Sequence, residues 1–384
     1  MKKRLILGMA ALAAVTLTSC QKDQVINQVP QEQEIGFTTY TGRDAQTKGT
    51  VMGVTELKSK GFGVYAYYTT TTNTLESYNT AAETAELAFK PNFMQNTEVS
   101  GSTWNYYPKK YWPKGNDTYR LSFLAYAPHS NGTENGITHS YSEVTTNDYK
   151  FGHPLLKYTV DTDVANHQDV LFAPLSQNKE IQRQNTNDGT VQLHFFHALS
   201  RIGFKVSTAA NYNSNDNITI KVKKITLRGK MVTTGTMNLY LAEGTKASGT
   251  VGQQEYVHAV STPGWTLEAK SDAEVEYVVE NNVTPNYSNY TLFSDNYIMM
   301  MPQTFEKTNN PSTPNLSIDV EYDVTYSTPA TVTIGNKVSI DVTEDNAITF
   351  IPGYAYTFKL AIGLDAIEFN ATVEDWGTLM PESK

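Results

Sequence analysis

Cysteine is almost absent from the chain, and its absence limits the chemistry that the protein can carry out. Cys20 is the single cysteine among 384 residues. Beyond it the chain has no intrachain disulfide, no thiol nucleophile and no cysteine-based metal site. A basic excess is missing too, because 30 Lys and Arg face 39 Asp and Glu, for a net charge of -9. Phosphate binding needs a basic surface, so the composition excludes nucleic acid as a partner.

Short motifs of enzymes and metal sites are also missing. The sequence contains no G-x-S-x-G, H-E-x-x-H, P-loop or G-x-G-x-x-G, and nothing selects one pair of its many carboxylates as a glycosidase pair. A calcium loop counted from Asp161 needs Gly sixth and Glu twelfth, where this chain has Asn166 and Phe172. We therefore predict no catalytic residue, no metal and no cofactor. The stretch is interpreted as an acidic surface loop that contains Asp161, Asp163, His167 and Asp169.

A long apolar run occurs at the N-terminus, where Lys2, Lys3 and Arg4 precede apolar residues 5–17. The run is too short for a stable membrane span, so it predicts a secretory signal peptide at residues 1–19. The residues Leu17-Thr18-Ser19-Cys20 resemble the lipobox of bacterial lipoproteins, which implies a lipid on Cys20 and anchoring in the outer membrane. The alternative is an ordinary cleaved signal with an unmodified cysteine.

Helical periodicity is scarce, whereas Tyr (24 residues), Thr and Val are abundant, which favours strands. The length suits two domains, and the polar, turn-rich stretch 182–189 is the predicted boundary. We predict an all-β fold of two antiparallel β-sandwich domains, at residues 35–187 and 188–384, after a flexible tether at residues 20–34.

Alternating or continuous apolar patterns place the individual strands. The predicted strands are Ile35–Tyr40, Gly61–Tyr68, Val191–Phe195, Ile218–Lys223, Tyr297–Pro302 and Leu316–Val324. Gly335-Asn336 predicts a hairpin turn inside the segment 332–342. Residues 69–102 are interpreted as a long loop, with a helix candidate at Ala81–Leu87.

Aromatic residues gather in a recognisable block. Residues 104–113 read W-x-Y-x-P-x-x-Y-W-P in outline and lead into L-S-F-L-A-Y-A-P at 121–128. Further stretches in the same order are Asp169–Ala173, His194–Ile202, Pro352–Phe358 and Val373–Trp376. As a set they resemble the fimbrillin-like family, the subunits of protease-activated (type V) pili of Bacteroidetes-type bacteria. The resemblance implies β-sandwiches of a transthyretin-like or Greek-key type.

The resemblance also implies assembly by strand addition. The first strand, with Ile35, Phe37 and Thr39, would block a groove until a trypsin-like protease removes it by cutting after Arg43 or, as the second choice, Lys48. The cut would also separate the folded part from the lipid on Cys20. Other pilus subunits are the implied partners, and an adhesive surface for a host or bacterial ligand is compatible with this role.

The position in a polymer stays open. The C-terminal strand, with Ile367, Phe369, Ala371 and Val373, is a candidate donor to a neighbouring subunit. Alternatively the chain only accepts a strand, as a tip subunit would, or keeps its lipid and serves as an anchor. A rival from another class is a monomeric surface lipoprotein that binds glycan or a host ligand, for which Trp104, Trp112 and Trp265 would have to be exposed and coplanar.

Overall fold

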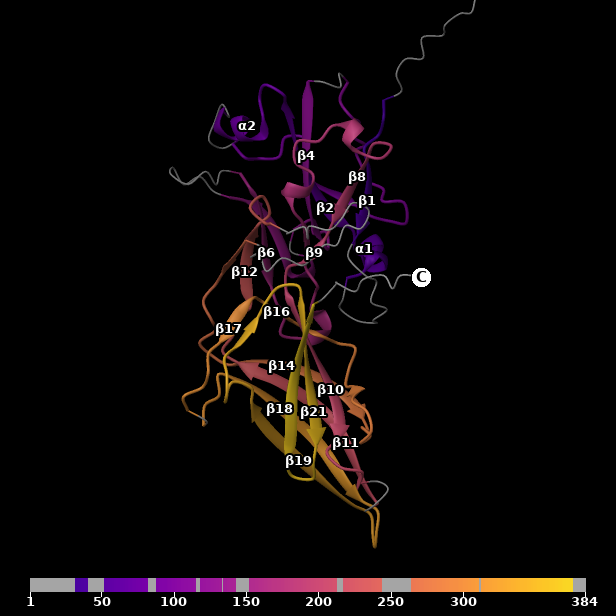
Figure 1. Ribbon diagram of the computed structural model, residues 1–384, viewed down its shortest axis with the longest axis vertical. Helices are drawn as coiled ribbons and strands as arrows, with labels where there is room; N and C mark the ends of the chain where they lie inside the picture. The colour runs from indigo at the N-terminus through magenta and orange to yellow at the C-terminus, as the bar shows by residue number, and fades with distance from the viewer. Residues whose placement is uncertain are drawn as a thin grey trace, which may run out of the picture.

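The computed structural model describes residues 32–40, 52–81, 88–114, 118–132, 134–142, 152–212, 217–243, 264–310 and 312–375. Cys20, Arg43, Lys48, Trp376 and residues 82–87 of the helix candidate lie outside the described residues. The molecule is elongated, with β1 and β8 in its upper part and β18 and β19 at the opposite end (Figure 1). Among the described residues, no helix has the length and apolar character needed to span a membrane.

The upper part contains a five-stranded sheet and a two-stranded sheet. The five strands pair antiparallel in the order β3 (Met94–Val99), β2 (Phe62–Thr70), β4 (Tyr119–Ala127), β7 (Leu171–Ala173), β9 (Phe196–His197). The two-stranded sheet joins β1 (Gly36–Tyr40) in parallel to β8 (Thr190–His194). The short helices are α1 (Val54–Lys60), α2 (Leu75–Ala81), η1 (Glu134–Gly136), η2 (Val164–Asn166), η3 (Leu175–Gln177) and η4 (Arg183–Asn185).

The lower part is built on two larger sheets. One has the order β15 (Thr291–Leu292), β10 (Ser200–Thr208), β21 (Tyr354–Ile362), β22 (Ile367–Asp375), with β16 (Ile298–Met300) also on β10. The other has the order β14 (Val275–Val283), β11 (Ile218–Gly229), β18 (Leu316–Tyr326), β19 (Val332–Asp341). Two further sheets have the orders β13 (Trp265–Leu267), β12 (Thr234–Asn238), β6 (Pro154–Thr159), β5 (Ile137–Tyr141), and β17 (Gln303–Phe305), β20 (Ile348–Phe350).

The five-stranded sheet is buried on both faces. Phe62, Val64 and Phe123 of β2 and β4 belong to a cluster that also holds residues of β1 and β8. Tyr65 and Leu124, on the same strands, belong to a second cluster that continues into the lower sheets. A strand covered on both faces needs apolar residues at successive positions. This explains why the sequences of β2 and β4 read as nearly continuous apolar runs.

The all-β prediction is confirmed, and three local predictions are wrong. Gly335-Asn336 forms no turn, since β19 pairs continuously with β18 and the chain reverses at residues 327–331. The stretch 69–102 contains α2 and β3 and is therefore no long loop. The sheets are not purely antiparallel, because β1–β8 and β10–β21 are parallel pairs. The alternation of apolar residues does not depend on strand direction, so it could not predict the two parallel pairs.

The acidic stretch 161–169 differs from the surface loop that its charges predicted. Asp161 and Asp163 are exposed, but His167 and Asp169 are fully buried. Both buried side chains have hydrogen-bond partners, described below, and paired polar groups can be buried at moderate cost. Among the described residues, no group of three or more His, Asp, Glu or Cys is arranged to hold a metal ion.

The predicted boundary between domains falls inside the upper part. Val191 and Leu193 of β8 lie in the same buried cluster as Ile35 and Phe37 of β1, and β9 pairs with β7. Residues 190–197 therefore pair with strands of the upper part, and the boundary at 182–189 stays a prediction.

His167 links the upper and lower parts. Its Nε2 donates to the carbonyl oxygen of Asp161 at 2.8 Å, and its Nδ1 accepts from the backbone N–H of Met299 in β16 at 3.0 Å. The ring also meets Tyr277 of β14 edge to face, at 4.9 Å between centroids. Burial lowers the pKa of His167 to about 4, against the weaker opposing influence of Asp161 and Asp163. The neutral ring is therefore the form that this contact requires.

We predict that stability falls on acidification because His167 must stay neutral. Its pKa is about 4 in the folded protein against an ordinary value of 6.5, so the unfolded chain binds more protons between these values. The contribution is full above pH 6.5 and is lost as the pH falls to 4, a change of about 3 kcal/mol in the free energy of unfolding. Urea titrations across this range should show a shallower pH dependence for His167→Gln. His139→Gln, on β5, is the control, and an unchanged slope in His167→Gln would contradict the assignment.

Phe37 of β1 offers a second prediction. It is 5% exposed, and its ring meets Tyr106, Phe123 and Phe62 edge to face at 5.4, 6.0 and 6.4 Å between centroids. Phe37→Ala should lower the free energy of unfolding by about 3 kcal/mol, through lost contacts and a cavity. The neighbouring Thr38→Ala, on the outer face, should cost less than about 1 kcal/mol. Equal midpoints for the two variants in urea denaturation would show that β1 contributes little to the core.

Candidate functional site

The first strand, β1, lies in a groove whose walls come from much later segments of the chain. Along one edge it pairs in parallel with β8, from Gly36 opposite Thr190 to Tyr40 opposite His194. Ile35 is fully buried and Phe37 nearly so, whereas Thr38 is partly exposed. The strand thus places alternate side chains into the core, as a half-buried strand should.

The other edge of β1 is held at its start by residues 106–112, which we call the clasp. The N–H of Ile35 donates to the carbonyl oxygen of Lys110 at 2.9 Å, and the Tyr106 hydroxyl donates to the carbonyl oxygen of Ile35 at 2.8 Å. The N–H of Trp112 donates to the carbonyl oxygen of Gln33 at 2.9 Å. Burial raises the pKa of Tyr106 to about 12, so its hydroxyl keeps the proton that it donates.

Opposite charges accompany these backbone bonds. Lys109 of the clasp lies 2.5 Å from Glu34, and Lys114, just beyond the clasp, lies 3.1 Å from Glu32. The Lys109 ammonium also lies 4.7 Å from the centroid of the Tyr106 ring. All four charged side chains are partly exposed, so each pair contributes less than about 1 kcal/mol. These lysines favour acidic residues just before the strand that lies in the groove.

Gly189 joins β1, the clasp and the start of β8. Its carbonyl oxygen accepts from the N–H of Gly36 at 3.1 Å and from the indole N–H of Trp112 at 2.8 Å. Its φ is +75°, and a Cβ at this position would lie 2.8 Å from Cγ of Gln33. A residue with a side chain therefore fits neither the backbone conformation nor the space.

The three tryptophans considered as a glycan platform do not form one exposed surface. Trp112 is 5% exposed, and its indole is bound as described. Trp104 is half-buried and packs against Phe62 at 5.4 Å between ring centroids. Trp265, also half-buried, lies on β13 and donates its indole N–H to Ala198 at 2.8 Å. These contacts assign all three to packing.

The residue that resumes the described chain after β1 is firmly held. Met52 is 3% exposed, and its N–H donates to one carboxylate oxygen of Asp169 at 2.9 Å. The other Asp169 oxygen lies 3.0 Å from Nδ1 of His197, and both of these side chains are buried. Residues 41–51, which contain Arg43 and Lys48 and lie outside the described residues, therefore connect two anchored points.

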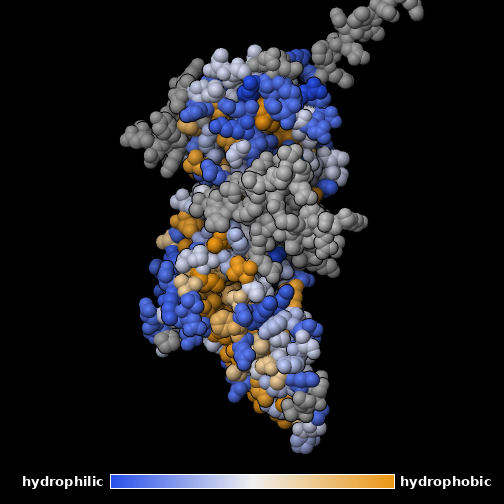
Figure 2. Space-filling view, in the orientation of Figure 1, coloured by the Kyte–Doolittle hydropathy of each residue, from blue (hydrophilic) through white to orange (hydrophobic). Residues whose placement is uncertain are grey.

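The C-terminal strand, β22, contrasts with β1 in its surroundings. It forms a complete antiparallel ladder with β21, from Tyr354 opposite Asp375 to Ile362 opposite Ile367, and it ends the strand order of its sheet. Phe369 and Val373 are 40% and 54% exposed. Figure 2 shows that apolar residues gather on the lower half of the visible face, whereas the upper half is mostly hydrophilic.

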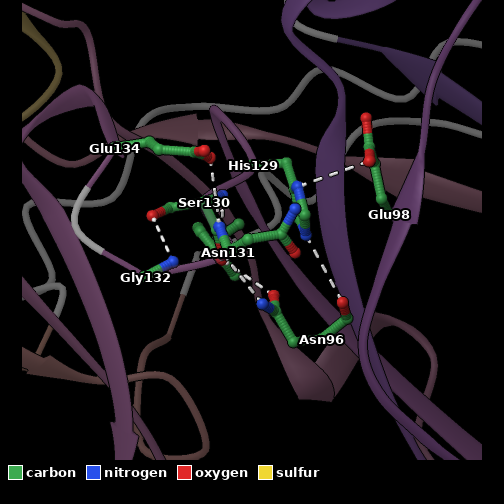
Figure 3. Close-up of polar contacts among 8 residues, drawn as sticks. Asn96, Glu98, His129, Ser130, Asn131, Gly132 and Glu134 are labelled. Atoms are coloured by element: carbon green, nitrogen blue, oxygen red, sulfur yellow. Dashed lines mark hydrogen bonds and ion pairs between the residues drawn. The ribbon is translucent and has the colours of Figure 1, made fainter.

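A cluster of polar side chains lies beside the end of β4 (Figure 3). Nδ1 of the buried His129 lies 3.7 Å from Glu98, and its Nε2 faces the carbonyl oxygen of Asn96 at 3.4 Å. The Asn96 amide donates to the carbonyl oxygen of Ser130 at 2.9 Å. Burial lowers the pKa of His129. These bonds tie β3 to the segment after β4, and we assign them a structural role.

A polar hollow lies on the outer face of the β1–β8 pair. Thr38, Thr190, Gln192 and His194 form one side of it, and the remaining lining residues belong to the segment 177–188. Neither this hollow nor the bonds between the clasp and β1 were predicted. The aromatic block 104–113 was the available sign, but its pattern does not reveal that it lies against a strand so distant in sequence.

Comparisons with known proteins agree with this architecture. The model of the fimbrillin-like family matches residues 47–376. The Fimbrium subunit Fim1C of Phocaeicola vulgatus is 27% identical over 388 aligned positions, which cover 95% of this chain and 93% of that protein. The crystal structure of a fimbrial protein from Bacteroides vulgatus has a TM-score of 0.58 at 21% identity, and the match covers 89% of this chain and 99% of the other. The family match extends over most of the chain, which therefore belongs to the fimbrillin-like family.

Proposed function

We propose that this protein is a subunit of a cell-surface pilus that receives a strand from a neighbouring subunit in the place of β1. The observation that carries the proposal is the seating of β1, which fills a groove made by β8 and the clasp and buries Ile35 and Phe37. A protease that cuts between Tyr40 and Met52 would leave β1 attached by non-covalent contacts alone. A strand of similar shape could then replace it.

The energetics are compatible with exchange. Burying each large apolar side chain stabilises the seated strand by about 1.5–3 kcal/mol, and the ladder with β8 adds hydrogen bonds. In the uncut chain this association is intramolecular, so a competitor faces a high effective concentration of β1. Cutting removes that advantage. Met52, held by Asp169, remains with the folded protein.

The C-terminal strand supports a role as acceptor. Release of β22 would break its whole ladder with β21 and leave β21 paired only with β10. A subunit that accepts a strand and donates none occupies the tip of a polymer. One observation favours the opposite role for β22: Ile367 and Phe369 repeat the spacing of Ile35 and Phe37 in β1, and Phe369 is 40% exposed.

The N-terminal residues would anchor the precursor and then allow its release. A lipid on Cys20 would hold the precursor at the outer membrane, and a trypsin-like protease would cut after Arg43 or Lys48 and release the subunit for assembly at the cell surface. A subunit that kept its lipid would instead serve as an anchor. A tip subunit would present its surface to a host or bacterial ligand. The rival role, a monomeric glycan-binding lipoprotein, loses its main support because the three tryptophans are packed.

We predict that the double variant Arg43→Ala, Lys48→Ala remains uncut and stays out of the pilus. Its β1 stays covalently linked and continues to fill the groove. The measurement is the fraction of subunit in sheared pili by immunoblot, with the N-terminal sequence of that fraction. Lys60→Ala, in α1, is the control and should assemble normally. Undiminished assembly of an untrimmed double variant would overturn the proposal.

A disulfide between β21 and β22 separates acceptor from donor. Thr357 and Thr372 are paired residues of the ladder, and Thr357→Cys with Thr372→Cys would lock β22 in place. If the protein only accepts a strand, the oxidised variant should enter pili as efficiently as the reduced one. Loss of assembly on oxidation, restored by reductant, would show that β22 leaves its sheet and is donated. Cys20 is the only other cysteine, and the proposed lipid occupies its sulfur, so it does not compete for the new disulfide.

A further inference from the structure

We infer that the β1 groove selects an incoming strand by five features, and that β22 of the same chain lacks two of them. The selected strand has acidic residues before it, a branched aliphatic residue, then a residue without a side chain, then an aromatic residue and, two positions later, a small apolar residue. Its source is therefore a different kind of subunit. This inference rests on the proposed exchange of β1 and specifies the partner.

The acidic requirement comes from the clasp region. Glu32 and Glu34 precede β1 and pair with Lys114 and Lys109, which belong to the wall that would remain after the cut. Lys109 also lies over the Tyr106 ring, which limits its movement. An incoming strand without these carboxylates would leave two lysines unpaired beside its first residues. Since the pairs are partly exposed, each adjusts affinity by a small factor.

The small residue is required opposite Thr190. Gly36 faces Thr190 in the parallel ladder, and a Cβ on Gly36 would lie 3.0 Å from Oγ1 of Thr190 and 3.6 Å from its Cβ. A contact of 3.0 Å between non-bonded carbon and oxygen is tighter than most, so the Thr190 side chain or the incoming strand must move by a few tenths of an ångström. A glutamate here would in addition place its charge beside the hollow that contains Asp188.

The aromatic residue is required by the core. Phe37 meets three aromatic rings edge to face, and Ile35 beside it is fully buried. Two positions further, the Thr39 hydroxyl is buried, and in the described part of the chain it has no hydrogen-bond partner. Burial of an unpaired hydroxyl is unfavourable. A small apolar residue such as alanine or valine therefore fits that position better than threonine.

Alignment of Ile367 with Ile35 shows where β22 agrees and where it fails. The aliphatic, aromatic and small apolar positions are matched by Ile367, Phe369 and Ala371. The two acidic positions hold Leu364 and Ala366, and the glycine position holds Glu368. The apolar pattern alone would permit self-association, and the flanking and glycine positions oppose it. Specificity then comes from unfavourable contacts as well as favourable ones.

Peptide exchange tests this selection directly. The mature chain is cut with trypsin, single cleavage within residues 41–51 is verified by mass, and fluorescein-labelled peptides compete with the seated β1. The peptides are residues 32–40, the same peptide with Gly36→Glu, Phe37→Ala or Thr38→Ala, and residues 364–372 of β22. The β1 peptide and its Thr38→Ala control should bind alike. The other three should bind at least about tenfold more weakly.

Two reciprocal changes make the test specific. Changing Ala366→Glu and Glu368→Gly in the β22 peptide should raise its affinity toward that of the β1 peptide. In the protein, Lys109→Glu should weaken the β1 peptide, and Glu34→Lys in the peptide should restore binding. A general loss of folding would not produce that rescue.

The outcomes separate the two proposals. Tight binding of the unmodified β22 peptide, or no gain from its two changes, would overturn the selection while strand exchange itself stands. If no peptide enters the groove, including the sequence of β1 itself, strand exchange fails and the selection fails with it. Binding of the β1 peptide with the stated order of affinities supports both.

Discussion

The insertion of Phe37 into the aromatic core, fixed by the parallel ladder between β1 and β8, is the contact on which the upper part depends. These two strands cover one face of the five-stranded sheet. Without β1, the apolar side chains of β2 and β4 that face it would lose part of their cover. An exposed apolar surface of this kind favours association. In the proposed exchange, the side chains that stabilise the protein before the cut are therefore also the ones that leave an apolar surface for the incoming strand.

The five-stranded sheet connects this groove to the rest of the molecule. Its second face belongs to the cluster that continues into the lower sheets. His167 adds a hydrogen bond from Met299 of β16 and a ring contact with Tyr277 of β14. The five-stranded sheet behind the groove is therefore packed on its other face whether or not β1 is in place. The lower part keeps both of its large sheets independent of β1, because neither sheet pairs with it.

Sequence patterns predicted the all-β class and the positions of the strands with the clearest apolar patterns, because apolar alternation reflects burial directly. They placed β1, β2 and the buried Ile298–Met300 strand within a residue or two. They could not predict that residues 106–112 lie beside Ile35, since this depends on pairing between distant segments. For the same reason the alternation at Val191 does not reveal that β8 joins β1. Gly335-Asn336 was misread because a pair suited to a turn also fits an exposed edge strand.

The hydrogen bonds at the entrance of the groove have a consequence for the vacated state. The carbonyl oxygens of Gly189 and Lys110, both used by β1, each have another donor within the remaining protein, the Trp112 indole and the Tyr106 hydroxyl. Departure of the strand therefore leaves these two acceptors satisfied without recruiting tightly bound water. The N–H of Trp112 and the ammonium groups of Lys109 and Lys114, by contrast, lose their partners when the segment leaves. An incoming strand therefore has to replace the water bound to these three groups, and not to the two carbonyl oxygens.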